Sequence, residues 1–88
     1  MPYVDKNSRA RYKDFVVFLQ GMPEISTKGD FEFLLMLLWR KFMSTREFKY
    51  SLLHDACYAV QHVADETRRR FLDVRENQAR QANGDVEL

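Results

Sequence analysis

The feature that most constrains the fold of this chain is a long series of apolar residues spaced three and four apart toward its C-terminal end. Such spacing predicts one face of an amphipathic helix. A helix of about 30 residues is ~45 Å long, whereas a compact domain of this size is roughly 30 Å across. The apolar face is therefore longer than its own domain, and we expect a second copy of the chain to cover the far end. The residues of this face are Leu53, Ala56, Val60, Val63, Thr67, Phe71 and Val74.

The composition predicts a single soluble domain spanning residues 1–88. A hydrophobic content of 45% and a charged content of 31% are typical of a folded globular protein. The formal net charge of +1 gives no reason to expect DNA or a membrane surface as a partner. Cys57 is the one cysteine, so we expect no disulfide, no metal site and no cofactor. The absence of a signal peptide or spanning segment favours the cytoplasm.

We expect an all-α protomer of three helices and no strand. The first helix spans about 8–20, with Asn7 or Ser8 as its cap and Gly21 ending it in the left-handed conformation. The second spans about 29–43 and is apolar on nearly every side, which again implies a neighbouring subunit. The third is the long C-terminal helix. Its start is marked either by a capping-box pattern at 44–47 or by Ser51, and its end by Asn-Gly at 83–84.

The segment before the second helix has the residues of an anion site. Two hydroxyls, an ammonium group and a glycine precede backbone amides that lack intrahelical partners. Such a helix start can hold a phosphate group. A plain helix cap would use the same residue types, so the local pattern leaves both interpretations open. The candidate residues here are Ser26, Thr27, Lys28 and Gly29.

Tyr12 is the second candidate, because it lies among basic residues on the polar half of the first helix. A tyrosine ring can stack on a nucleobase while nearby cations hold phosphate. Ser8 and Lys13 are its candidate neighbours in the site. If the connection to the second helix folds back, Tyr12 and Lys28 face one pocket, and a ring with an ammonium group matches a nucleotide. The alternative is an amphipathic tyrosine at a subunit interface.

A third candidate is the basic run Arg68, Arg69 and Arg70 in the long helix. Pairing of Asp65 with Arg69, and of Glu66 with Arg70, would make this run a solvated face with ion pairs. If several copies meet around a symmetry axis, the same arginines would form an anion pocket that a single chain lacks.

Catalysis is not expected. His54 and His62 are two helical turns apart, about 12 Å, which is too far to share one zinc ion. Cys57 lies beside the apolar face, where it packs as a small hydrophobe. The sequence contains no paired acids, no nucleophile with a base, and no glycine-rich phosphate loop. The roles of these three residues are not assigned by the pattern.

Four short motifs along the chain resemble one family. They occur in the order and spacing of the small bacteriophage anti-CBASS cyclic-nucleotide sponges, and the chain length is similar to that of T4-type members. The similarity covers essentially the whole sequence. The motifs are Met-Pro-Tyr-Val at 1–4, Lys-Gly-Asp-Phe-Glu-Phe at 28–33, Tyr-Ser at 50–51 and Asn-Gly-Asp-Val at 83–86.

The resemblance implies a compact helical homo-oligomer, a hexamer, that acts in the host bacterial cytoplasm without being an enzyme. It binds cyclic dinucleotides such as cyclic GMP–AMP (cGAMP) without cleaving them, which blocks host immune activation. Tyr12 matches the residue that stacks on a base, and Thr27 and Lys28 match the pair that holds phosphate. Some relatives also bind cyclic trinucleotides through an arginine of the third helix, which lies near residues 68–70.

The chain departs from the commoner relatives at two places. Phe-Glu-Phe at 31–33 replaces a Leu-Asn-Tyr type of sequence, and the last helix lacks their proline-containing stretch. The competing interpretation is a small helical oligomeric phage protein that binds nucleic acid or a host protein through its arginines and lysines. The near-zero net charge argues against the nucleic-acid form of that interpretation.

Overall fold

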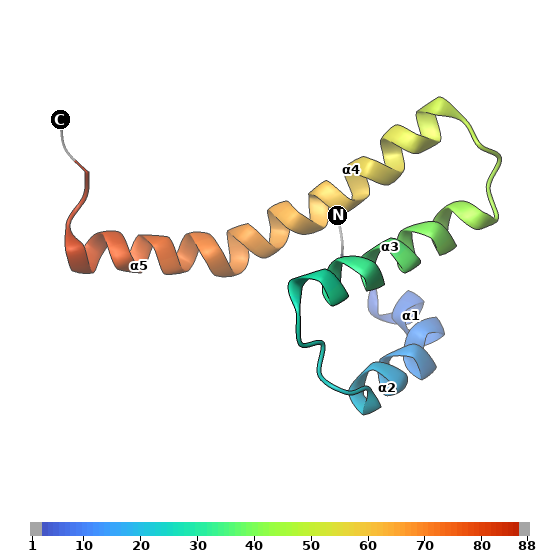
Figure 1. The fold of residues 1–88 in the computed structure, drawn as a ribbon, viewed down its shortest axis with the longest axis horizontal. Coiled ribbons are helices and arrows are strands. Elements are labelled where there is room, and N and C mark those ends of the chain that lie inside the picture. The colour runs from blue at the N-terminus through green and yellow to red at the C-terminus, as the bar shows by residue number, and fades with distance from the viewer. Residues whose placement is uncertain (1–2, 87–88) are drawn as a thin grey trace. The chain divides into compact units, whose positions relative to one another are not determined.

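The fold is given by a computed structural model, which describes residues 3–86 (Figure 1). Within these residues every regular element is helical, which confirms the all-α class. The parts of our predictions that concern residues 1–2 and 87–88 lie outside the described residues. The elements are α1 (Lys6–Arg9), η1 (Ala10–Tyr12), α2 (Lys13–Gly21), α3 (Lys28–Ser44), α4 (Tyr50–Thr67), the π-helical turn η2 (Arg68–Leu72) and α5 (Asp73–Asn83).

The chain divides into two compact units. Residues 3–56 form one, and the chain from Cys57 onward belongs to the other. That both belong to a single domain spanning 1–88 stays a prediction. Each unit is described here by itself.

The ends of the first helical region differ from the predicted ones. Asp5, not Asn7 or Ser8, is the N-cap, because its side chain accepts a hydrogen bond from the Ser8 amide at 3.0 Å. At the other end Gly21 is still helical, and Gly84 is the one described residue with a positive φ. The α2 helix ends because Met22 adopts an extended backbone conformation, with φ −70° and ψ 150°. The proline that follows disfavours helical geometry at Met22, so a left-handed glycine is not needed.

The connection from α3 to α4 is also different from the capping box predicted at 44–47. Ser44 is the last residue of α3, and its hydroxyl donates to the carbonyl of Lys41 at 2.8 Å. The α4 helix begins at Tyr50, next to the alternative start at Ser51. Ser44 therefore does not cap α4, because it is still part of α3 and five residues lie between it and Tyr50.

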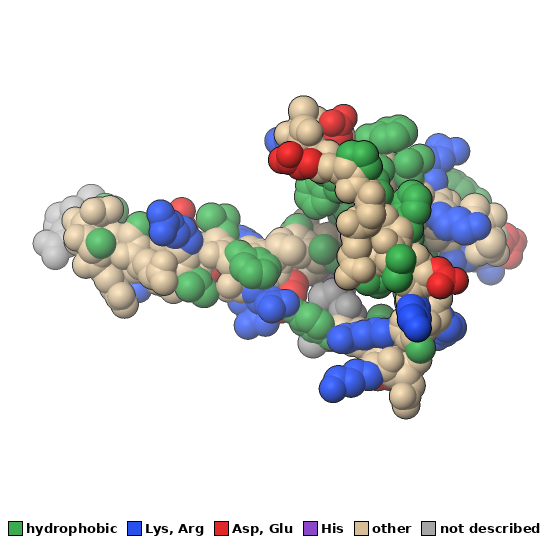
Figure 2. Space-filling model, turned by 90° about the horizontal axis from the view of Figure 1, so that it is seen from below, with side chains coloured by type: hydrophobic (Ala, Val, Ile, Leu, Met, Phe, Trp, Pro, Cys, Tyr) green, Lys and Arg blue, Asp and Glu red, His purple; other side chains and the backbone are tan. Residues whose placement is uncertain are grey.

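The unit of residues 3–56 has almost no closed core. Ala56, 1% exposed, is the single buried residue in the described chain, while Leu34, Trp39 and Met43 are half-buried. Large side chains of α2 and α3 remain open, among them Phe18 at 64% and Phe33 at 62%. Among its helices, η1 approaches α1 and α2 closely over several residues, and these three elements follow one another along the chain. Figure 2 shows hydrophobic side chains lying at the surface beside lysines and arginines.

The unit that begins at Cys57 leaves its apolar residues equally open. Val60, Val63, Phe71 and Val74 are 45% to 63% exposed. They lie on one helical stretch, in which α4, η2 and α5 follow one another without a break in the helical backbone. The long C-terminal helix predicted from the sequence is therefore present. Residues 57–86 contain no second helix or strand that could cover the apolar side of this helix.

The end of this helix provides a test of backbone geometry. Gly84 has φ 89° and ψ 152°. Essentially only glycine adopts this conformation, and it costs other residues about 1–3 kcal/mol of strain. We expect Gly84→Ala to lower amide-exchange protection in the last turn of α5 accordingly. Gly21→Ala is the matched control, because Gly21 is helical and an added Cβ meets nothing within 4 Å. Equal protection of α5 in both variants would contradict this assignment.

Candidate functional site

The N-terminal end of α3 is built around Thr27. Its hydroxyl oxygen accepts a hydrogen bond from the Asp30 amide at 3.0 Å, and its carbonyl accepts one from Phe31 at 3.1 Å. The predicted cap is thus confirmed. Because the hydroxyl oxygen serves as acceptor, its hydrogen is left to donate outward. The amides of Lys28 and Gly29 belong to the first turn, whose donors lack intrahelical partners. Cap and anion donor are therefore compatible roles for Thr27.

Lys28 is the cation nearest to these amides. Its ammonium group lies 3.6 Å from Glu32 Oε1, and the two side chains are 91% and 61% exposed. An exposed pair one helical turn apart contributes only about 0.3–0.5 kcal/mol, and a lysine preceding its glutamate is the weaker order. Lys28 can therefore exchange Glu32 for a phosphate at little cost. The carboxylates of Asp30 and Glu32 oppose an anion here, so a ligand needs further contacts.

Gly29 and Ser26 complete this segment. A Cβ added at Gly29 would lie 3.9 Å from Thr27 Oγ1, an ordinary contact, so the fold does not require glycine here. The missing side chain instead leaves the backbone of the first turn open to a ligand. The Ser26 hydroxyl donates to the Glu24 carbonyl at 3.5 Å, at the long limit for a hydrogen bond. Ser26 can therefore turn toward another acceptor.

Tyr12 is placed where the first helical region bends. It is the last residue of η1, with φ −107° and ψ 12°, and α2 begins at Lys13 directly after it. Its side chain is 52% exposed, and within residues 3–86 its ring makes no stacking contact. Ser8, one turn earlier, is half-buried and donates its hydroxyl to Asp5 Oδ2 at 3.1 Å. A flat, exposed ring next to the exposed Lys13 is thus available for stacking.

One chain does not join these two groups of residues. The nine residues of α2, about 13 Å of helix, separate Tyr12 from the loop that leads to Thr27. Figure 1 shows η1 and this loop at opposite ends of α2. The structure brings Ser26, Thr27, Lys28 and Gly29 together, and Ser8 with Tyr12 and Lys13, as two separate groups. Within residues 3–86 no hydrogen bond, ion pair or ring contact joins the two groups.

The three arginines lie in the π-helical turn η2. Arg69 pairs with Glu66, its Nε donating to Oε2 at 3.2 Å. The predicted partner Asp65 instead accepts a hydrogen bond from Gln61 Nε2 at 2.9 Å, so that ion-pair prediction is wrong. The Arg70 guanidinium lies 5.2 Å from the centroid of the Phe71 ring. Arg69 is therefore bound to a residue of its own helix. All three arginines lie in a turn that is wider than an α-helical turn.

The residues named above as unassigned, His54, His62 and Cys57, do not gather into a metal site within residues 3–86. His54 contacts Tyr50 edge to face, with ring centroids 4.5 Å apart, and Cys57 is exposed. Residues 3–86 contain no group of three histidines, cysteines or acids placed to hold a metal ion. The same residues include no helix long and apolar enough to cross a membrane.

Two features were missed by the sequence interpretation. The first is the Asp5 cap, for which the signal was an aspartate three residues before a serine. The second is a groove of about 630 Å³ along the C-terminal half of α3. Its signal was the alternation of aromatic and basic residues between Trp39 and Tyr50.

A family model described as a domain of unknown function (DUF6899) matches residues 1–86. No curated protein and no solved structure is detectably similar to the chain.

Asp5 gives a test of the region around Tyr12. Hydrogen bonds from the Ser8 amide and then the Ser8 hydroxyl lower the pKa of Asp5 below its ordinary value of 3.8. The ionised Asp5 side chain therefore stabilises the folded state above pH 3.8. This contribution is lost as the pH falls through the pKa that Asp5 has in the folded state. We expect Ser8→Ala to raise the Asp5 pKa part of the way toward 3.8 in an NMR titration. Ser26→Ala is the control. An unchanged Asp5 pKa in Ser8→Ala would contradict the hydrogen bond from the Ser8 hydroxyl to Asp5.

Proposed function

The chain belongs to a family of domains of unknown function, DUF6899, and we propose that it acts as a non-enzymatic cyclic-dinucleotide sponge. In this proposal it binds messengers of the cGAMP type in the host bacterial cytoplasm. Binding keeps them from the effectors of the CBASS antiphage defence. The resemblance of the motifs at 1–4, 28–33, 50–51 and 83–86 to anti-CBASS sponges supports this function.

The observation that carries the proposal is the exposed start of α3. It combines outward-facing amides, the Thr27 hydroxyl hydrogen and an ammonium group held only by a weak pair with Glu32. Backbone donors at a helix start favour phosphate. Charge-assisted hydrogen bonds from Lys28 would strengthen that contact. The exposed Tyr12 ring supplies the base-stacking surface.

Self-association is the second part of the proposal, and we propose a hexamer. Large apolar side chains are exposed in both units, and a second copy would cover them. No contact joins the two groups of candidate residues within residues 3–86, and in this proposal a pocket between copies takes Tyr12 from one and Lys28 from the other. A ligand with two bases and two phosphates would meet the same residues twice across a two-fold axis.

The affinity required of a sponge is within reach of such a pocket. Withholding a messenger at sub-micromolar level needs a Kd near nanomolar, about −12 kcal/mol. Two base stackings contribute ~1–3 kcal/mol each, and charge-assisted phosphate contacts ~1.5–3 kcal/mol each. Assembly of the oligomer before binding reduces the ordering cost that these contacts must offset. Sequestration then follows by mass action, without a chemical step.

The arginines of η2 support a further site for cyclic trinucleotides. Arg68 and Arg70 lie in a π-helical turn, a geometry frequent at functional sites. Copies related by an axis would bring several such turns together. The ion pair of Arg69 with Glu66 would have to open before Arg69 could bind an anion.

The first test of this function uses Tyr12→Ala and Lys28→Ala. Each should weaken cGAMP binding about tenfold or more, because each removes one stacking or one charge-assisted contact. Isothermal calorimetry measures the affinity, and recovery of the ligand after heat denaturation should return it intact. Lys49→Ala is the matched control, since Lys49 pairs with Glu47 in the loop before α4. Wild-type affinity in both site variants, or recovery of linear product, would refute the proposal.

The second test measures assembly. Sedimentation velocity at micromolar concentration should show a species larger than one chain. Val63→Asp should shift it toward smaller species, because Val63 is exposed at 45% and a charge there prevents apolar cover. Asp65→Asn is the control, because Asp65 is two residues further on and lies on the opposite side of the helix. A well-folded wild-type monomer at this concentration would overturn the shared pocket.

A further inference from the structure

A groove along the C-terminal half of α3 is separate from the residues discussed so far. It has a volume of about 630 Å³ and lies entirely within the unit of residues 3–56. None of its lining residues belongs to the Tyr12 or Lys28 groups. The lining residues are Leu37, Trp39, Arg40, Lys41, Met43, Ser44 and Phe48.

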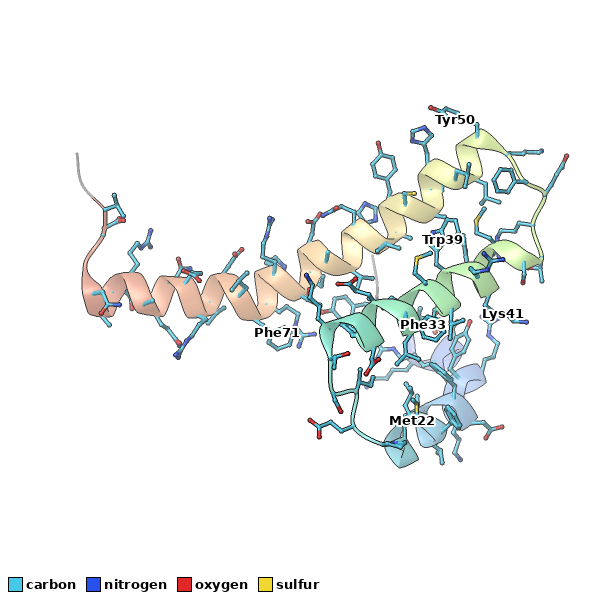
Figure 3. The ribbon with its side chains drawn as sticks, in the orientation of Figure 1. Met22, Phe33, Trp39, Lys41, Tyr50 and Phe71 are labelled. Atoms are coloured by element: carbon cyan, nitrogen blue, oxygen red, sulfur yellow. The ribbon has the colours of Figure 1, made fainter. Side chains whose placement is uncertain are left out.

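Helix geometry distributes these side chains around the groove. Successive residues of an α-helix are about 100° apart, so Arg40 and Ser44 share the middle face. Trp39 then lies on one side of Arg40 and Lys41 on the other. Figure 3 shows Trp39 and Lys41 on this half of α3. The groove therefore has an aromatic side and a cationic side, with an arginine between them.

The two cations of the groove are Arg40 and Lys41. Within residues 3–86 neither the Arg40 nor the Lys41 side chain makes an ion pair or hydrogen bond. The other two cations of this region are engaged: Arg46 lies 3.9 Å from the Phe42 ring centroid, and Lys49 pairs with Glu47 at 3.4 Å. The positive charge of Lys41, in the last turn of α3, also interacts favourably with the negative end of the helix dipole. The dipole does not account for two unpaired cations beside two aromatic rings.

Phe48 is the second aromatic side chain of the groove. It comes from the loop after α3 and is 76% exposed. Removal of a phenylalanine side chain from water lowers the free energy, so this exposure is unfavourable. Together with the half-buried Trp39 it offers flat apolar surface next to positive charge. A ligand that satisfies both sides carries a planar ring joined to an anionic group.

We propose that this groove binds a nucleotide unit, with the base on Trp39 and Phe48 and the phosphate on Arg40 and Lys41. Base stacking on aromatic side chains combined with nearby cations is the usual basis of such binding. The unit can be a free nucleotide or part of a single strand, since both present the same chemistry. This site is independent of the cyclic-dinucleotide pocket and goes beyond the sponge function.

Trp39 allows a direct test, because it is the only tryptophan of the chain. The intrinsic fluorescence of the full chain is titrated with adenosine monophosphate and with a short oligodeoxythymidylate. We expect stacking to quench Trp39. Saturation by the monophosphate identifies a free nucleotide, and tighter binding of the oligomer with a steep salt dependence identifies a strand.

Variants separate this site from the sponge pocket. Lys41→Gln should weaken the quenching titration by about tenfold, the scale of one charge-assisted contact, whereas Lys49→Gln should leave it within about twofold. Phe48→Ser, in an exposed loop position, should weaken it without loss of fold. Tyr12→Ala should leave it unchanged. No quenching by either ligand, or quenching that is lost in Tyr12→Ala but kept in Lys41→Gln, would overturn the groove site and leave the sponge proposal standing.

Discussion

The balance between apolar surface and the means of covering it governs this molecule. Residues 3–86 contain many large hydrophobic side chains, and yet Ala56 alone is buried. Burial of apolar surface is the main favourable term in folding, at about 25 cal/mol per Å². Helices whose large apolar side chains stay exposed forgo most of it. Such helices gain their stability chiefly from packing against something else, and for this chain we propose that copies of itself supply it.

This constraint bears on how a binding site can arise. Tyr12 ends η1, Thr27 and Lys28 start α3, and α2 with its following loop lies between the two groups in the sequence. Each group is locally well formed, through the Asp5 and Thr27 caps. In the proposed function, assembly therefore does two things at once: it covers the apolar faces and completes the pocket. Binding affinity and oligomer stability would be coupled for that reason.

The sequence predicted the helices better than their ends. The residues of α3 and of the long C-terminal helix follow from strong hydrophobic periodicity, and the Asn83-Gly84 stop follows from the conformational freedom of glycine. The N-cap of α1 was predicted wrongly, because Asp5, Asn7 and Ser8 compete for it and local geometry selects Asp5. Of the two starts predicted for α4, the one at 44–47 is wrong and the one at Ser51 lies one residue from the observed Tyr50. The arrangement of Tyr12 and Lys28 could not be predicted either. It depends on the path of the loop at Met22-Pro23, which no periodic pattern encodes.

The π-helical turn η2 has a consequence for the apolar side of the long helix. A turn that closes from i to i+5 winds less per residue than an α-helix, so the residues after Leu72 are rotated relative to a regular continuation. Val60 and Val63 precede this turn, and Val74 follows it. The series of apolar residues that reads as one straight stripe in the sequence is thus split into two stretches aimed in different directions. A single helix of this kind can meet two neighbours rather than one, as closed rings of subunits require.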